Sequence, residues 1–312
     1  MQYRCLPGTE LRVSQLGLGT VQLGMPYGLG LLDPPADEEC ERLLYRALDL
    51  GINYFDTAAA YGRSEEVLGQ ALSGAHPEPV VATKVGVRGD AGTALTGAAL
   101  RDHIEGSLLR SLRRLRLDRL DLVQIHNGDA ETITDELLEI MDSMRNKGLV
   151  RFWGATTYGE EYPLAVLKVG QEHFSTLQVA YNLLDRSLEA RVIPQSRARG
   201  VALILRSIFL KGVLSDRWQH LPDHLSALGA AAGIAAEVAA AAGISLSELA
   251  LRFAVHNPGI APHVAVVGTS SIPELEANVS ALNAGPLPQP VLAALESIAV
   301  EDAALLNPGN WQ

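Results

Sequence analysis

Four side chains that could act together on a proton follow three consecutive β-rich runs of this sequence. Asp56, Lys84 and His126 each end one of these runs, and Tyr61 lies in the loop after Asp56. If the runs are neighbouring parallel strands of a barrel, their carboxyl ends meet at one rim. An acid, an ammonium, an imidazole and a phenol would then face the same opening.

Each of these residues also has an ordinary structural explanation. Asp56 can cap the next turn, and Lys84 can be a solvated cation at a strand end. Tyr61 can pack within its loop, and His126 can be a core histidine with satisfied hydrogen bonds. Their joint position on one rim is the stronger signal, because ionisable groups gathered at a cavity are typical of functional sites.

The set suits general acid catalysis on a carbonyl oxygen. A phenol with a pKa of about 10 is a weak acid at neutral pH, and an adjacent ammonium favours its phenolate. Lys84 would tune Tyr61, and Asp56 would balance the charge of Lys84. Tyr61 would protonate the oxygen as it becomes an alkoxide, and His126 would donate a second hydrogen bond to that oxygen. Because this chemistry needs no nucleophile, we expect hydride to come from a cofactor.

Strand and helix patterns alternate along the sequence. Apolar residues recur with a helical period from Cys40 to Leu48 and stop at Gly51, and Ser245 with Glu248 forms a capping pattern at the start of another helix. The strand candidates are Gln15–Gly19, Asn53–Asp56, Val80–Lys84, Leu120–His126, Val150–Gly154, Leu177–Tyr181, Val201–Arg206 and Val264–Val267.

Eight such alternations predict a single (β/α)8 TIM barrel that residues 1–312 form as one domain. A hairpin around Pro7-Gly8-Thr9 would precede the barrel, and a helical extension would follow it at the C-terminus. An open doubly wound sheet is the alternative fold. The alanine-rich stretch Leu228–Ala242 is expected to be a covering helix that packs through Ile234 and Val238.

Composition limits the partners and the location. The formal net charge is −11, so phosphate surfaces would repel most of the protein, and we expect no nucleic-acid or membrane partner. Cys5 and Cys40 lie in no zinc-binding spacing, which predicts no metal site and a reducing compartment. We find no signal-peptide pattern and no apolar run of about 18 residues. A cytoplasmic location is therefore expected, whereas the oligomeric state is not indicated.

The chain resembles the aldo-keto reductase superfamily. The segments that carry the resemblance are Phe55–Gly62, Thr83-Lys84 and Gln124-Ile125-His126, which hold Asp, Tyr, Lys and His in the chain order of the family tetrad. The resemblance implies a barrel enzyme that reduces an aldehyde, ketone or sugar-like carbonyl. It also implies a nicotinamide cofactor, a small-molecule carbonyl substrate and Tyr61 as the proton donor.

The second half of the chain resembles the cofactor-binding half of the family. Thr156, Thr157 and Gln178 correspond to groups that hold the nicotinamide carboxamide, and Val267–Asn278 corresponds to the adenosine-phosphate segment. The residues that the resemblance implies for cofactor binding are Thr156, Thr157, Gln178, Arg206, Ser207, Leu210, Gly212, Gly268, Thr269, Ser270, Glu274 and Asn278.

Several of these positions depart from the family pattern. Arg206 stands where many members stack an aromatic ring on the nicotinamide, and its planar guanidinium could stack instead. Thr157 replaces the usual asparagine. Ser270 stands where Lys or Arg generally pairs with the 2′-phosphate of NADP, and Glu274 would repel that phosphate. The resemblance thus implies NADP, and these two residues leave NAD as the alternative.

Other functions are compatible with parts of this pattern. One is an aldose dehydrogenase that runs the reverse reaction, and another is a non-catalytic nicotinamide-binding subunit with a redox-sensing role. A lyase or isomerase with a Schiff base on Lys84 is a third, but the nearby Tyr61 and Asp56 favour activation of the phenol. We expect the substrate pocket to be lined by Val21, Tyr27, Trp153 and residues that follow Leu214.

Overall fold

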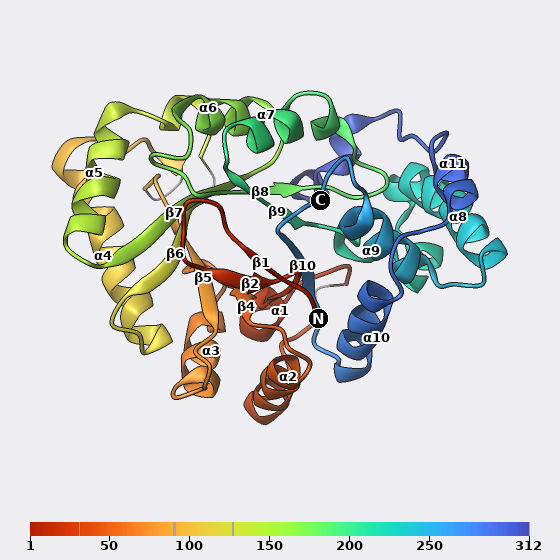
Figure 1. The fold of residues 1–312 in the computed structure, drawn as a ribbon, viewed down its shortest axis with the longest axis horizontal. Coiled ribbons are helices and arrows are strands. Elements are labelled where there is room, and N and C mark those ends of the chain that lie inside the picture. The colour runs from red at the N-terminus through yellow and green to blue at the C-terminus, as the bar shows by residue number, and fades with distance from the viewer. Residues whose placement is uncertain (31, 90–91, 127, 312) are drawn as a thin grey trace.

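Parallel strands separated by helices close into a barrel at the centre of the molecule (Figure 1). The computed structural model describes residues 1–30, 32–89, 92–126 and 128–311. Within these residues the ring has eight strands, and β10 pairs with both β3 and β9 to close it. The predicted barrel is confirmed, and the open sheet is wrong. The strands are β3 Leu16–Gly19, β4 Tyr54–Asp56, β5 Val80–Gly86, β6 Leu120–His126, β7 Val150–Thr157, β8 Thr176–Ala180, β9 Ala202–Arg206 and β10 Val264–Gly268.

Helices surround this ring (Figure 1). They are α1 Val21–Gly24, α2 Asp37–Asp49, α3 Ser64–Leu72, α4 Gly97–Leu115, α5 Asp135–Asn146, α6 Glu161–Val169, α7 Val192–Ala198, α8 Ser226–Ala241, α9 Leu246–His256, α10 Ile272–Asn283 and α11 Gln289–Leu295. Short 3₁₀ turns include η4 Leu210–Gly212 and η5 Asp216–His220. The predicted C-terminal extension consists of α11 with η7 Ala303–Leu306 and η8 Pro308–Asn310.

Local sequence signals explain where several helices begin. The Ser245 hydroxyl accepts a hydrogen bond from the Glu248 backbone N–H at 3.1 Å and caps α9 as predicted. The carboxylate of Glu248 pairs with Arg252 at 2.8 Å, one turn further on. Ser271 caps α10 in the same way through the backbone N–H of Glu274.

The two-residue period of each strand decides which side chains enter the barrel. Apolar side chains fill its lower half, at the N-terminal ends of the strands. The hairpin of β1 Tyr3–Cys5 and β2 Arg12–Ser14, which was predicted, closes this end with its own apolar side chains. The interior cluster comprises Leu6, Leu11, Val13, Tyr54, Val80, Ala82, Leu122, Ala202, Ile204, Val264 and Val266. Further along the same strands, at their C-terminal ends, the inward-facing positions are polar. They hold Asp56, Lys84, Gln124, Gln178 and Arg206, so a polar layer lies above the apolar one.

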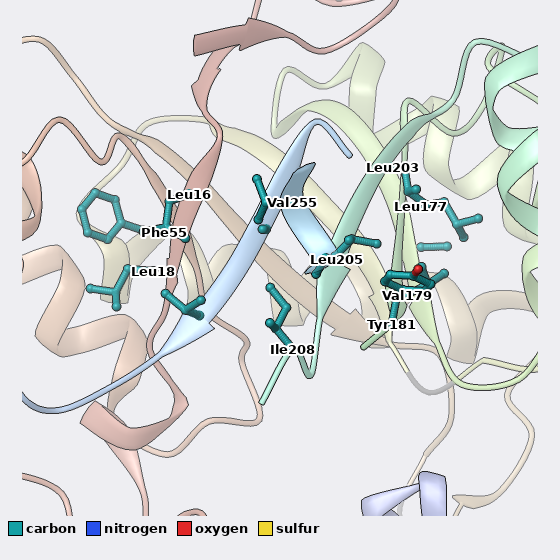
Figure 2. Packing of buried hydrophobic residues seen from close by; sticks show 14 of the residues in the cluster. Leu16, Leu18, Phe55, Leu177, Val179, Tyr181, Leu203, Leu205, Ile208 and Val255 are labelled. Carbon is teal, nitrogen blue, oxygen red and sulfur yellow. The ribbon is translucent and has the colours of Figure 1, made fainter. Parts of the chain in front are cut away.

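The alternate residues of the strands point outward and pack under the helices. Figure 2 shows Leu16, Leu18, Phe55 and Leu205 among this second cluster. Trp153 belongs to it, fully buried, and its indole N–H donates to the Met141 carbonyl at 3.0 Å. The expectation that Trp153 lines the substrate pocket is wrong, because its position on β7 directs it toward the helix layer.

The alanine-rich segment forms α8 as predicted, but Ile234 is not on its buried face. Ile234 is 52 % exposed, whereas Ala232 and Ala235 are fully buried. Small side chains let this helix approach its neighbours closely, so the alanines make the main contact; Val238 is partly buried and packs against the core as expected, whereas Ile234 does not. The helical segment Asp223–Ala241 is long and apolar enough to cross a membrane by length and composition alone, a test that a buried core helix also passes. Its buried alanine face is what a covering helix of a barrel requires.

The barrel interior leaves no room for a side chain at Gly17. A Cβ atom there would lie 2.7 Å from Tyr54 Cδ1 and 2.9 Å from Val264 Cγ1. We expect Gly17→Ala to lower the free energy of unfolding by about 1–3 kcal/mol through overpacking. Urea unfolding followed by circular dichroism measures this change.

Gly106 in α4 provides the matched control. The nearest atom to a Cβ there is Arg110 Nη1 at 3.4 Å, the end of a flexible side chain. Gly106→Ala should be neutral or should stabilise the helix by about 0.5–1 kcal/mol. Equal losses in the two variants would contradict the packing described for Gly17.

Candidate active site

A buried ion pair between Lys84 and Asp56 lies at the centre of the polar layer. The Lys84 Nζ atom lies 2.6 Å from Asp56 Oδ1 and donates a second hydrogen bond to the Thr57 carbonyl at 2.7 Å. Lys84 is 2 % exposed and Asp56 is 5 % exposed. Burial by itself lowers the pKa of Lys84, but the charge of Asp56 and the phenol of Tyr61 outweigh it and raise the pKa overall. Lys84 is therefore a fixed ammonium.

The other carboxylate oxygen of Asp56, Oδ2, accepts hydrogen bonds from two side-chain amides. Gln178 Nε2 donates at 2.8 Å and Gln124 Nε2 at 3.2 Å. Gln178 Oε1 accepts from Thr156 Oγ1 at 2.9 Å. Sequence reasoning assigned Gln178 and Thr156 to the cofactor and missed Gln124. The signal for Gln124 was its position on β6, two residues before His126 and thus on the same face of the strand.

Tyr61 lies over the ion pair, in the loop between β4 and α3. Lys84 Nζ is 4.7 Å from the centre of its ring, and the His126 ring meets it edge-on with centroids 6.1 Å apart. The loop fits tightly against Gly24 at the end of α1, where a Cβ would lie 2.1 Å from the Tyr61 carbonyl oxygen. Gly62 follows with a φ of 54°, which glycine adopts without strain. The structure thus brings the four predicted tetrad residues together.

His126 is a neutral imidazole at physiological pH. Burial lowers its pKa to about 3, and the positive charges of Lys84 and Arg206 act in the same direction. A neutral imidazole has one N–H donor and one acceptor nitrogen. His126 can therefore donate a hydrogen bond to a substrate oxygen without bringing a charge.

A cavity of about 840 Å³ opens over this layer, within the size range of small-molecule sites. Asp56, Tyr61 and His126 line it. The predicted cofactor residues that line it are Thr156, Thr157, Arg206, Ser207, Gly212, Gly268, Thr269, Ser270, Glu274 and Asn278.

Some residues that the sequence assigned to the site do not line this cavity, among the residues that the structure describes. Lys84 and Gln178 lie beneath its floor, bonded to Asp56. Leu210 as a whole residue is 1 % exposed and packs in the core, so it does not reach the cavity. The predicted substrate-pocket residues Val21 and Tyr27 line the cavity, and so does Trp218, which follows Leu214 in the chain. Burial raises the pKa of the Tyr27 phenol to about 12.

The loop after β9 has a strained backbone. Ser207, Leu210 and Lys211 have φ values of 59°, 44° and 53°, which side chains with a Cβ rarely adopt. Such strain is typical of functional sites. Asn182 holds this loop, because its Nδ2 donates to the Ser207 carbonyl at 3.1 Å and its Oδ1 accepts from the Leu184 N–H at 2.9 Å.

Near α10 the cavity wall is acidic. Glu274 Oε2 accepts a hydrogen bond from Thr269 Oγ1 at 2.6 Å, and Glu274 and the exposed Ser270 both line the cavity. Nearby, Gln22 Oε1 is buried with no hydrogen-bond partner within the described residues. A Cβ on Gly268 would lie 2.6 Å from that oxygen. A buried, unpaired amide oxygen beside the cavity fits a polar ligand that supplies a donor, as the amide and hydroxyl groups of a dinucleotide do.

In the described ranges, no group of three or more His, Cys, Asp or Glu residues is placed to hold a metal ion. Cys5 and Cys40 are free thiols, exposed and buried respectively.

Comparison with known proteins connects this geometry to a family. The family model described as "Aldo/keto reductase family" matches residues 15–300. Among solved structures, the chain is similar to aldo-keto reductase AKR11C1 from Bacillus halodurans in its holo form. The TM-score is 0.77 with 28% identity, and the match covers 96% of both chains.

Two relatives match most of the chain and carry different names. A protein of Oryza sativa subsp. japonica named "Probable voltage-gated potassium channel subunit beta" is 29% identical over 295 residues, which cover 83% of this chain and 85% of the relative. The L-galactose dehydrogenase of Arabidopsis thaliana is 28% identical over 275 residues, covering 83% of this chain and 82% of the relative.

The low pKa of His126 makes stability depend on pH. The unfolded chain binds a proton at this imidazole with a pKa of about 6.5, whereas the folded state holds the pKa at about 3. The stabilisation from the neutral imidazole is present above pH 6.5 and is lost as the pH falls below that value. We expect the loss to reach about 1–2 kcal/mol at about pH 5.

Urea unfolding of the wild type and His126→Gln at about pH 7.5 and about pH 5 tests this expectation. Between about pH 7.5 and about pH 5, the free energy of unfolding should fall by about 1–2 kcal/mol less in the variant than in the wild type. His263, whose pKa burial lowers to about 4, contributes equally to both proteins. Identical losses would contradict a neutral, buried His126.

Proposed function

This chain is an oxidoreductase of the aldo/keto reductase family, and we propose that it reduces an aldehyde, ketone or sugar-like carbonyl with a nicotinamide cofactor and Tyr61 as proton donor. The observation that carries the proposal is the position of Lys84 Nζ, 2.6 Å from Asp56 and 4.7 Å from the centre of the Tyr61 ring. We further propose that residues 1–312 act as one domain in the cytoplasm.

The side chains divide the work on the substrate oxygen. Tyr61 gives its hydroxyl proton to the oxygen, and the ammonium of Lys84 stabilises the phenolate that remains. Asp56 keeps Lys84 charged and in place. His126, as a neutral donor, orients and polarises the same oxygen. A nicotinamide cofactor, when held by the polar residues along the cavity, would supply the hydride.

The amide network beneath the tetrad positions the ion pair. Gln124 and Gln178 satisfy Asp56 Oδ2, which leaves Oδ1 to Lys84. A buried charge pair is favourable only when its remaining hydrogen-bonding capacity is filled. We therefore assign Gln124 and Gln178 a positioning role, and Gln178 would meet the cofactor only through its partner Thr156.

Polar residues along the cavity between Thr156 and α10, other than Arg206, would hold the cofactor. The backbone of the strained loop at Ser207 lines the cavity, as does the start of α10 near Ser270, where N–H groups can hold a phosphate; the Gly212 N–H already donates to the Phe209 carbonyl at 2.8 Å. The acidic wall at Glu274 and the neutral Ser270 would weaken the hold on a 2′-phosphate. We propose NADP as the cofactor with weak discrimination against NAD.

The alternative functions differ in how well the geometry supports them. A Schiff base needs a neutral amine, whereas Lys84 is an ammonium bonded to Asp56 and the Thr57 carbonyl. The reverse reaction would use the same residues, and the relative named L-galactose dehydrogenase supports aldose oxidation as a second candidate. A redox-sensing channel subunit, suggested by the name of the rice relative, would not require the complete tetrad.

We expect Tyr61→Phe to abolish carbonyl reduction and to leave cofactor affinity nearly unchanged, because the hydroxyl acts on the substrate oxygen. Steady-state kinetics with a panel of aldehydes, ketones and sugars, together with cofactor fluorescence titrations, measure both. Tyr45→Phe removes an exposed phenol on α2 that does not line the cavity and should stay within about threefold of wild type. A Tyr61→Phe variant within about tenfold of wild type would exclude Tyr61 as the donor.

Cofactor choice should respond to charge at position 270. We expect Ser270→Arg to strengthen NADP binding by roughly 1.5–3 kcal/mol through a charge-assisted contact, with little change for NAD. The measurement is a pair of titrations with both cofactors at fixed ionic strength. Ser280→Arg, on the exposed face of α10, is the matched control and should not discriminate. Equal effects of Ser270→Arg on both cofactors would show that the 2′-phosphate lies elsewhere.

A further inference from the structure

Arg206 is a fixed cation in the cavity whose contacts are all neutral. Its Nη2 donates to the Thr157 carbonyl at 2.7 Å, and its Nη1 donates to Ser207 Oγ at 3.1 Å. The guanidinium carbon lies 3.9 Å from the centre of the Tyr158 ring. These contacts hold the side chain in place without neutralising its charge. A guanidinium has five N–H donors, so several are left for a ligand.

Two other cations line this cavity: Lys211 donates to the Pro308 carbonyl at 3.3 Å, and Arg217 is exposed to solvent. Lys84 pairs with Asp56, and Glu274 accepts a hydrogen bond from Thr269. Across the part of the chain that the structure describes, no carboxylate forms an ion pair with Arg206. A partly buried cation without a counter-charge costs free energy, which an anionic ligand would recover.

The position of Arg206 on the rim separates it from the proton donor. It ends β9, which is four strands from β5 in the closed ring and therefore on the opposite side of the barrel. Lys84 and the overlying Tyr61 belong to the β5 side. A substrate that reaches both would carry its anionic group several bonds away from its carbonyl.

This inference rests on the proposed function: we propose that Arg206 binds a carboxylate of the substrate, so that the enzyme prefers carbonyl compounds with a remote carboxylate to their neutral counterparts. Guanidinium groups bind carboxylates through two parallel hydrogen bonds. The net charge of −11 would repel an acidic substrate, so its binding needs a local cation of this kind. The role differs from the stacking on nicotinamide expected from the sequence.

The test compares 4-carboxybenzaldehyde with 4-carbamoylbenzaldehyde, which have similar shapes and differ in charge. We expect the wild type to show a kcat/KM at least about tenfold higher for the acid. Arg206→Gln should remove that preference by raising KM for the acid, while the amide stays within about threefold. Arg206→Lys, which keeps a cation, should retain part of the preference.

Two further measurements separate this role from others. Dissociation constants of NADP and NAD should change by less than about threefold in Arg206→Gln. Arg199→Gln removes an exposed cation that does not line the cavity and should leave the acid-to-amide ratio unchanged. Thermal unfolding of each variant shows whether it is folded.

The outcomes are distinct. Equal wild-type kcat/KM values for acid and amide would overturn the inference without affecting the proposed function, and this comparison needs no variant. A large loss of cofactor affinity in Arg206→Gln with an unchanged acid-to-amide ratio would assign Arg206 to the cofactor and also overturn it. Absence of turnover with every carbonyl compound would contradict the proposed function, and the inference would fall with it.

Discussion

The ion pair of Asp56 and Lys84 inside the barrel is the interaction on which the rest of the site depends. Two opposite charges so little exposed are stable only if every remaining polar atom finds a partner. The barrel supplies these partners from four directions, namely the Thr57 carbonyl, two glutamine amides and the overlying phenol. The chemistry proposed for Tyr61 follows from this arrangement, because the ammonium cannot leave its position beneath the ring.

The barrel makes this pair possible by dividing its interior into two layers. The lower layer is apolar and is closed by the N-terminal hairpin through Leu6, Leu11 and Val13. This end excludes water from below, so the polar layer above it opens only toward the cavity. The strand period explains why the same strands provide both layers, since every second residue of each strand points inward.

Charge is distributed unevenly around the cavity. The tetrad is internally balanced, the wall near α10 carries Glu274, and the rim at β9 carries the cation Arg206. His126 stays neutral, because burial and the nearby cations Lys84 and Arg206 oppose its protonation. Neutral polar groups at the reacting oxygen and charged groups at the edges are suited to a substrate whose reactive and recognition groups are separate.

The sequence by itself determined the elements and the four candidate tetrad residues, because short-range patterns carry that information: strand runs ending in Asp56, Lys84 and His126, a loop with Tyr61, and helical periods between them. It did not determine which distant groups meet. Gln124 was missed, since only closure of the ring brings β6 toward the carboxylate on β4.

The burial of individual side chains also had to come from the tertiary structure. Trp153 faces the helices, and α8 packs through alanines while Ile234 stays exposed. The direction of a strand side chain depends on where the barrel axis lies, and the buried face of a helix depends on its neighbours. Likewise, the uncompensated charge of Arg206 follows from contacts with Thr157, Ser207 and Tyr158 that the folded loops create. Local sequence patterns determine the period of each strand and helix. The burial and the charge balance of a side chain depend on all of its contacts, and only the closed barrel brings these contacts together.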